Sequence, residues 1–158
     1  MQTAIITSSL TVVSGVIVFF FSQILLKYII EPISDFRKIR SQISVQLIYY
    51  ANIYSNLFKY NEENKNNEKL VVRLDEVSNT FRKLASELIG ISNIIPFYSL
   101  FSIMRLIPSR KNIQSASSNL IGLSNSIWTN GINNEDNNMK YNRERKNEIV
   151  KLLRIKSM

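Results

Sequence analysis

The first 26 residues of this chain contain no charged side chain. The run reads MQTAIITSSLTVVSGVIVFFFSQILL and is followed by Lys27. A helix needs about 20 apolar residues to cross the hydrocarbon core of a bilayer, so the run is long enough. The core helix of a soluble domain rarely keeps an apolar run of this length without helical periodicity. We therefore expect a transmembrane anchor over residues 1–30.

A cleaved signal peptide is the main alternative for this run. Such a peptide begins with a positively charged region and ends with a small-x-small cleavage site. Here no Lys or Arg precedes the apolar residues, and the sequence that follows them is KYIIEP. These two features favour an anchor that is retained in the mature protein.

The basic residues near the run predict its orientation. The N-terminal side has none, whereas the C-terminal flank carries Lys27, Arg37, Lys38 and Arg40. Because cytoplasmic flanks are enriched in Lys and Arg, the N-terminus is expected outside and the remainder in the cytoplasm. Lys27 and Tyr28 are expected at the membrane interface, where Lys snorkels and Tyr lies among the headgroups.

One face of the expected anchor carries small and polar residues. Small residues allow two helix backbones to approach closely in a membrane, and a Gln side chain can hydrogen-bond between neighbouring spans. The pattern predicts a homo-oligomer, with the alternative that Ser and Thr are simply common in such helices. The residues of this face are Thr7, Thr11, Gly15, Ser22 and Gln23.

The composition excludes several kinds of chemistry. The chain has no Cys and no His, so disulfides, thiolate zinc sites and imidazole bases are absent. With four glycines it has no glycine-rich phosphate loop, and it has no metal-ligand spacing. Its carboxylate pairs lie in polar sequence without apolar surroundings that would raise a pKa. We therefore expect no enzyme activity, no cofactor and no metal.

Residues 31–128 are expected to form a cytoplasmic helical bundle, which makes the fold all-α. The EP dipeptide at Pro32 predicts a kink or a short break. Apolar residues then recur at helical spacing on three segments. The polar stretch 59–69 separates the first segment from the second. The three stripes begin Ile33, Phe36, Ile39, Ile43 and Leu47; Leu70, Leu74, Val77, Phe81, Leu84 and Leu88; and Ile113, Ala116, Leu120, Leu123 and Ile127.

A second charge-free stretch runs from Leu88 to Met104, inside the apolar segment 88–107. It is shorter than the first and is interrupted by Gly90 and Pro96. Three interpretations remain open: a buried hairpin of the bundle, an interfacial segment at the membrane surface, or a second span. Phe97 and Phe101, with Tyr98 and Met104, are the residues expected to touch lipid in the second interpretation.

The C-terminal residues divide into a linker and a basic tail. Residues 129–139 are rich in Asn and are expected to link the bundle to a helix over 140–158. That helix has seven Lys and Arg against two Glu, with an apolar side that includes Ile149 and Leu153. It could contact anionic headgroups or dock on the bundle.

The stretch SQILLKYIIEPISDFRKIRSQISVQLIYYANIY resembles a family of small bacterial single-span membrane proteins of unassigned activity. In that family an apolar span is followed by the dipeptide EP, then by a basic helix, and then by the tripeptide YAN. The later stretches RKLASELIGISNIIPFY, LIPSRKNI and NLIGLSNSI are similar to the rest of the pattern. The resemblance covers residues 15–128. It implies a bacterial origin and the same anchor-plus-helices plan, and it transfers no catalytic residue and no ligand.

These patterns lead to a main functional hypothesis and an alternative. The main one is a non-enzymatic, membrane-anchored helical protein that oligomerises and binds a cytoplasmic protein partner, as a sensor or effector in bacterial stress or phage defence. The alternative is a receptor for an anionic small ligand such as a nucleotide, held by Arg105, Arg110 and Lys111 at a helix start. The net charge of +8 permits nucleic-acid binding, but a cytoplasmic membrane face explains the same excess more simply.

Overall fold

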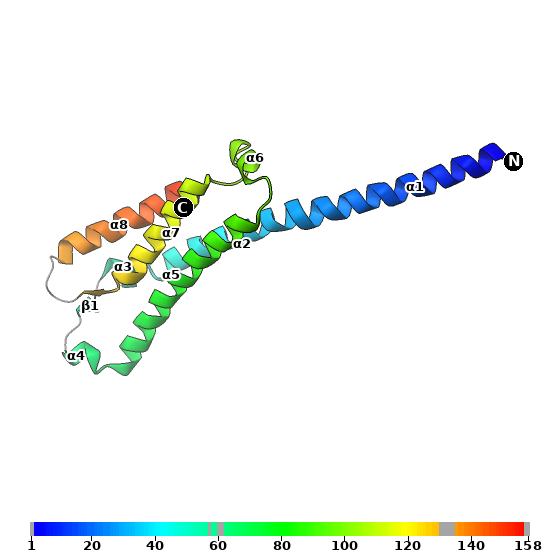
Figure 1. Cartoon of the computed structure of the whole chain (residues 1–158). Coiled ribbons are helices and arrows are strands. Elements are labelled where there is room, and N and C mark those ends of the chain that lie inside the picture. The colour runs from blue at the N-terminus through cyan, green and yellow to red at the C-terminus, as the bar shows by residue number, and fades with distance from the viewer. Residues whose placement is uncertain (1, 57, 60–61, 130–134, 157–158) are drawn as a thin grey trace.

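The computed structural model describes residues 2–56, 58–59, 62–129 and 135–156. Within these residues the chain is all-α apart from one two-residue strand pair, which confirms the all-α part of the prediction. One long N-terminal helix projects from a bundle formed by the remaining helices (Figure 1).

The elements follow one another with short connections. The N-terminal helix comprises α1 (Gln2–Leu25), which projects, the π-helical segment η1 (Leu26–Ile30) and α2 (Glu31–Tyr49), which packs on the bundle. After α3 (Ala51–Ser55), the two-residue strand β1 (Phe58–Lys59) and α4 (Glu62–Lys65), the chain forms the long helix α5 (Glu68–Ile94). The last elements are α6 (Tyr98–Ile103), α7 (Arg110–Asn125), β2 (Trp128–Thr129) and α8 (Glu135–Leu152). β1 and β2 pair in parallel, with Phe58 opposite Trp128.

The chain stays helical through Pro32, where the sequence predicted a kink or break. Proline has no N–H and its ring collides with the carbonyl four residues earlier in an α-helix. The turn before it is widened to a π-helix, in which the Glu31 N–H donates to the Leu26 carbonyl five residues back. This wider turn accommodates the proline ring, so α1, η1 and α2 form one continuous helix instead of two separate helices (Figure 1).

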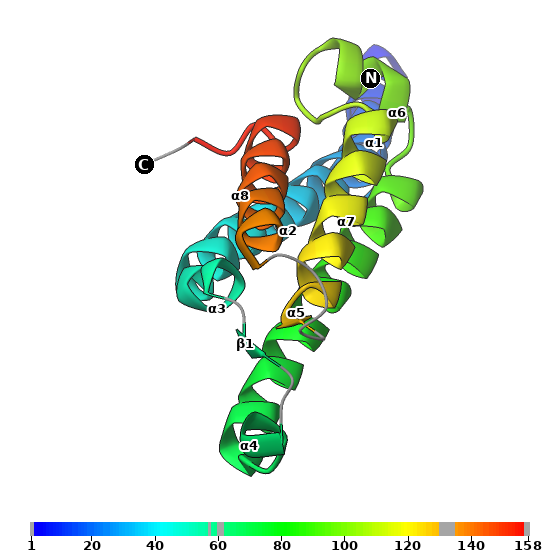
Figure 2. The same cartoon turned by 90° about the vertical axis from the view of Figure 1, so that its left-hand side faces the viewer.

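The core of the bundle lies where α2, α5, α7 and α8 meet (Figure 2). Each helix buries one apolar stripe because its apolar residues recur every three or four positions. The stripes predicted for the three segments are buried, apart from the half-buried Ile39 and Leu70. The largest fully buried side chains are Phe36, Phe81, Ile43, Leu74, Leu88, Ile107, Ile113, Leu120, Leu123, Ile127, Ile149 and Leu153.

Side-chain caps fix where the two central helices begin. Asn67 precedes α5 and its side-chain oxygen accepts from the Leu70 N–H, while Ser109 precedes α7 and accepts from the Asn112 N–H. Such caps satisfy one of the free N–H groups of the first turn. The stretch 59–69, expected to be a loop, contains the short helix α4.

Small hydroxyl side chains join α5 to α7. The hydroxyls of Ser78 and Ser124 lie 2.7 Å apart, and the Ser117 hydroxyl donates to the Ala85 carbonyl at 3.1 Å. Arg82 adds a bond from its Nε to the Ser124 hydroxyl at 3.0 Å. Because these side chains are short, the two helices can pack closely while their buried polar atoms remain paired.

A buried asparagine ties the tail helix to the bundle. Asn142 is 0% exposed, and its Nδ2 donates to the Tyr54 carbonyl at 2.9 Å. Its Oδ1 accepts from the Ser126 hydroxyl at 2.7 Å and from Arg145 Nη1 at 3.1 Å. Together with the buried Ile149 and Leu153, this network shows that α8 docks on the bundle.

Two helical glycines differ sharply in the space around them, which gives a first testable prediction. A Cβ at Gly90 would have nothing within 4 Å, so Gly90→Ala should stabilise the protein by about 1 kcal/mol through helix propensity. A Cβ at Gly122 would lie 2.6 Å from Arg145 Nε and displace that side chain from Gly122 and Asn142. Gly122→Ala should therefore destabilise by about 1 kcal/mol, because charged hydrogen bonds contribute more than the propensity gained.

Thermal unfolding of the detergent-solubilised chain, followed by circular dichroism, measures both changes. Arg145→Ala alone and with Gly122→Ala completes a double-mutant cycle. The clash explanation is wrong if Gly122→Ala costs as much in the Arg145→Ala background as it does alone.

Candidate functional site: membrane and partner surfaces

The surface of α1 is apolar and uncovered. The helix projects away from the bundle, and none of its apolar window is buried by the rest of the chain (Figure 1). Among the described residues, one helix is long and apolar enough to cross a membrane, and α1 is its apolar part. An N-terminal signal sequence would have the same length and composition. A continuous apolar surface of this size on a soluble protein would have to be covered by something else.

The small-residue face of α1 is open for close approach but has no free hydroxyl hydrogens to share. Thr7 donates to the Thr3 carbonyl, Thr11 to the Thr7 carbonyl, and Ser22 to the Val18 carbonyl. A Cβ at Gly15 would meet nothing within 4 Å. A second helix could therefore pack closely against this face but would find no free Thr or Ser hydroxyl hydrogen on it. Gln23 is the remaining exposed polar residue of the face. Self-association through it stays a prediction.

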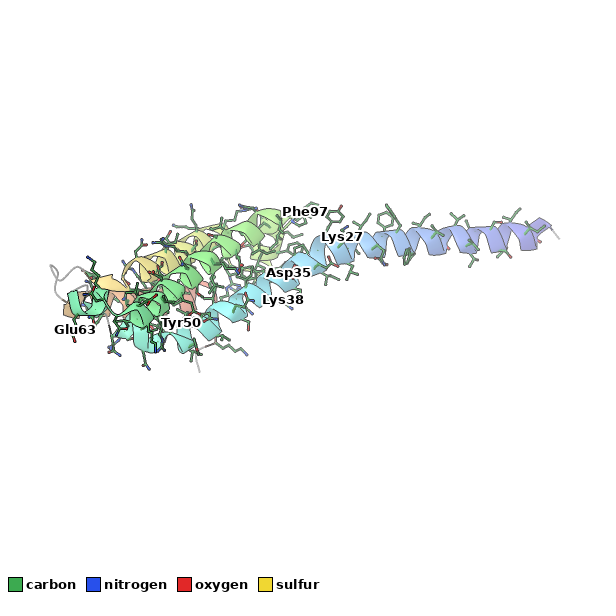
Figure 3. The ribbon with its side chains drawn as sticks, turned by 90° about the horizontal axis from the view of Figure 1, so that it is seen from below. Lys27, Asp35, Lys38, Tyr50, Glu63 and Phe97 are labelled. Carbon is green, nitrogen blue, oxygen red and sulfur yellow. The ribbon has the colours of Figure 1, made fainter. Side chains whose placement is uncertain are left out.

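Lys27 and Tyr28 lie in η1, where the projecting helix reaches the bundle (Figure 3). Tyr28 is exposed, and the next residue, Ile29, is the first along the chain to pack against the core. The change from a helix without neighbours to a helix packed on a bundle thus occurs at the position predicted for the membrane interface.

The apolar segment 88–107 turns one side to the core and the other outward. Tyr98 and Phe101 were expected to touch lipid, but both are core residues, 4% and 8% exposed, so the expectation was wrong for these two. Phe97 and Ile103, in contrast, are 73% and 80% exposed. The two sets lie on opposite sides of the short helix α6. We define the apolar cap as the exposed set Ile94, Phe97, Leu100, Ile103 and Met104.

Polar contacts hold α6 on the bundle. The Tyr98 hydroxyl donates to the Pro108 carbonyl at 2.8 Å, and burial raises the pKa of this phenol although the Arg110 charge lowers it in part. The Arg110 guanidinium lies 4.5 Å from the centre of the Tyr98 ring, and Arg154 Nη1 donates to the Arg105 carbonyl. These contacts make the outward position of the apolar cap a feature of the folded bundle.

The three cations predicted to bind an anion have different surroundings. Arg110 uses its guanidinium on Tyr98 and on Asn93 Oδ1, and Ser109 already caps the first turn of α7. Arg105 and Lys111 are also exposed, and the Arg105 carbonyl accepts from Arg154 Nη1. An anion site formed by these three cations stays a prediction.

A groove that sequence reasoning missed runs between α2 and α8. Three adjoining hollows of about 420, 340 and 410 Å³ share lining residues and follow both helices. Leu47, Ile48 and Val150 form apolar floor, and Ile48 is exposed. We call this the α2–α8 groove. Its basic lining residues are Arg37, Arg40, Arg143, Lys146, Arg154 and Lys156.

The charge of the α2–α8 groove is of one sign. No acidic residue lines the three hollows, and within the described residues none of the six cations forms an ion pair. The sequence signal was present, because 37, 40, 44 and 48 fall on one helical line and 143, 146, 150 and 154 on another. Nothing in the sequence showed that the two lines face each other.

The described residues contain no cluster of three or more carboxylates that could hold a metal ion. Of the carboxylate pairs, Asp75 and Glu76 are both exposed on α5.

No family model, curated protein or solved structure matches this chain. The resemblance to small bacterial single-span proteins stays a prediction, and the function has to be inferred from the surfaces described above.

Proposed function

We propose that this protein is a non-enzymatic, membrane-anchored binding protein, a sensor or effector at the bacterial inner membrane. In this proposal α1 stays in the lipid with its N-terminus outside and self-associates through its small-residue face. The bundle lies in the cytoplasm, where the α2–α8 groove binds an acidic, amphipathic helical segment of a protein partner.

The observation that carries the anchoring is the complete exposure of an apolar α1. Its charge-free residues exceed the roughly 20 needed to cross a bilayer, and the first charge, Lys27, coincides with the point where the bundle begins. The basic side chains of α2 then follow on the bundle side, as the cytoplasmic flank of a span requires.

The chemistry of the α2–α8 groove selects its occupant. Its floor is apolar, and its six basic residues form no ion pair with any residue that the structure describes. A segment with Leu-like residues on one side and carboxylates along the other would complement both. The groove follows α2 for three to four turns, which corresponds to a helix about 20 Å long. A second copy of the same face is disfavoured because its charges have the same sign.

Binding of a synthetic peptide tests this groove. The probe is an amphipathic helix of about 14 residues with Leu on one face and Glu on the other, added to the full chain in nanodiscs. Ile48→Asp should weaken binding at least about ten-fold by placing a carboxylate in the floor, and Arg143→Glu with Lys146→Glu should do the same. Fluorescence anisotropy of the labelled peptide measures the affinity.

Matched controls lie on α5, away from the groove. Val72→Asp introduces the same change at an exposed apolar position, and Lys69→Glu reverses an exposed charge. Both should leave the affinity unchanged. Equal losses from control and groove variants, or equal binding of a scrambled peptide of the same composition, would show non-specific charge attraction and refute the groove. If only Arg110→Glu with Lys111→Glu weakens peptide binding, the binding site lies at the start of α7 and the groove is refuted.

A further inference from the structure

We infer that the apolar cap is a second membrane contact, which enters the headgroup region of the leaflet from which α1 emerges. The inference rests on the proposed anchoring of α1 and adds a lipid surface as the partner of α6. It concerns a part of the molecule that is remote in sequence from the span.

The chemistry of the apolar cap fits an interface with lipid. Its five members are large apolar side chains at the end of α5, in α6 and at the two caps of α6, and Phe97 and Ile103 are more than two-thirds exposed. Soluble surfaces rarely gather such residues without a binding purpose. Burying them among acyl chains would remove a large apolar area from water.

The position of the apolar cap is the second observation. α6 lies at the end of the bundle from which the projecting helix departs (Figures 1 and 2). In Figure 3, Phe97 and Lys27 lie at a similar level along the projecting helix. If Lys27 marks the membrane surface, a cap at this level meets that surface without any rearrangement of the bundle.

The charges around the apolar cap point the same way. Arg105, Arg110 and Lys111 follow it closely, and the sequence contains no Asp or Glu from residue 88 to residue 134. Basic residues beside an inserted apolar surface are attracted to anionic headgroups, and no carboxylate in this stretch opposes that attraction.

The backbone at both ends of α6 is in an unusual conformation. Phe97 has φ of 49° and Arg105 has φ of 60°, both in the left-handed region that non-glycine residues rarely adopt. These two residues let the chain leave α5, expose one face of α6 and return to α7. Strain of this kind is commonly found where a protein positions a functional surface.

Two attachments in one leaflet would fix the orientation of the bundle. A single span allows the body to rotate about the helix axis, whereas a second contact beside it prevents that rotation. The apolar cap would then determine which way the bundle, including the α2–α8 groove, faces along the membrane.

Depth-dependent quenching in vesicles tests the inference on the full chain. Trp128→Phe removes the native tryptophan, and Phe97→Trp or Ile103→Trp places a single reporter in the apolar cap. Two further reporters serve as references: Phe20→Trp in the span, and Val72→Trp at an exposed apolar position on α5. The vesicles contain equal phosphatidylcholine and phosphatidylglycerol, with bromine placed either near the headgroup or near the end of the acyl chain.

We expect the cap reporters to be quenched at least about two-fold more than Val72→Trp, most strongly by the shallow bromines. Phe20→Trp should be quenched by the deep bromines. If the span reporter is quenched but the cap reporters match Val72→Trp, the cap inference is wrong and anchoring stands. If Phe20→Trp is not quenched, the anchoring itself fails.

A second experiment separates lipid from protein as the cover of the apolar cap. Cap reporters that resist both brominated lipid and aqueous acrylamide would lie against a second copy or another protein, which overturns the inference. In the Phe97→Trp chain, Leu100→Asp with Ile103→Asp should abolish the shallow quenching while circular dichroism stays unchanged, because both side chains are exposed. Phe101→Asp is unsuitable for this purpose, since it would place a carboxylate in the core.

Discussion

Replacement of Asn142 by alanine is expected to lower the free energy of unfolding by about 3 kcal/mol, because it leaves buried polar groups without partners. In the native protein this side chain accepts from Ser126 and Arg145 and donates to the Tyr54 carbonyl. Tyr54 belongs to α3, Ser126 follows α7 and Asn142 belongs to α8, so three parts of the bundle lose a shared contact. Thermal unfolding of the detergent-solubilised chain measures the change.

Asn147→Ala provides the matched control, because it removes the same side chain from an exposed position on the same helix. It should change the free energy of unfolding by less than about 0.5 kcal/mol. Alanine favours the helix more than asparagine does, so helix propensity cannot explain a loss at either position. Similar losses from the two variants would therefore contradict a special contribution of the buried network.

Two arginines placed one turn apart in α1 should prevent stable membrane insertion. Val16 and Phe20 lie near the middle of the apolar run and both are exposed. An arginine at the centre of a span costs about 3 kcal/mol on insertion scales, so Val16→Arg with Phe20→Arg should cost about 6 kcal/mol. We expect the double variant to leave the membrane fraction or to be degraded, as measured by flotation of cell membranes.

Val45→Arg with Tyr49→Arg makes the same pair of changes, with the same spacing, on the exposed surface of α2. This control should float with the membranes as the unmodified chain does. Unchanged flotation of the Val16 and Phe20 variant would contradict the anchor. So would an intact mass showing that the mature chain begins beyond Tyr28, since α1 would then be a cleaved signal.

The helices and their buried faces followed from local sequence to a large extent. The stripes of α2, α5 and α7 are buried as their three- and four-residue spacing predicts, because a helix can bury only one side. The start of α7 at Pro108 and Ser109 was also readable, since Ser caps the first turn. Of the kink or break predicted at Pro32, the break is absent, because a π-helical turn accommodates the proline ring without ending the helix.

The surfaces were harder to predict because they depend on which helix lies beside which. Phe97 and Phe101 look equivalent in an unbroken apolar segment, yet packing against the bundle buries Phe101 and leaves Phe97 exposed. The basic tail helix was compatible with either headgroups or the bundle, and the fit of Asn142, Ile149 and Leu153 placed it on the bundle. The same docking produced the α2–α8 groove from residues that are about 100 positions apart.

By itself, the sequence determined the all-α class, the apolar helix at the N-terminus and the inward face of each main helix, because these depend on hydrophobicity and spacing within one segment. Only the tertiary structure decided which apolar residues of α6 remain outside, and that two basic helices face each other across a groove. Those features arise from contacts between distant segments, which a local pattern does not specify.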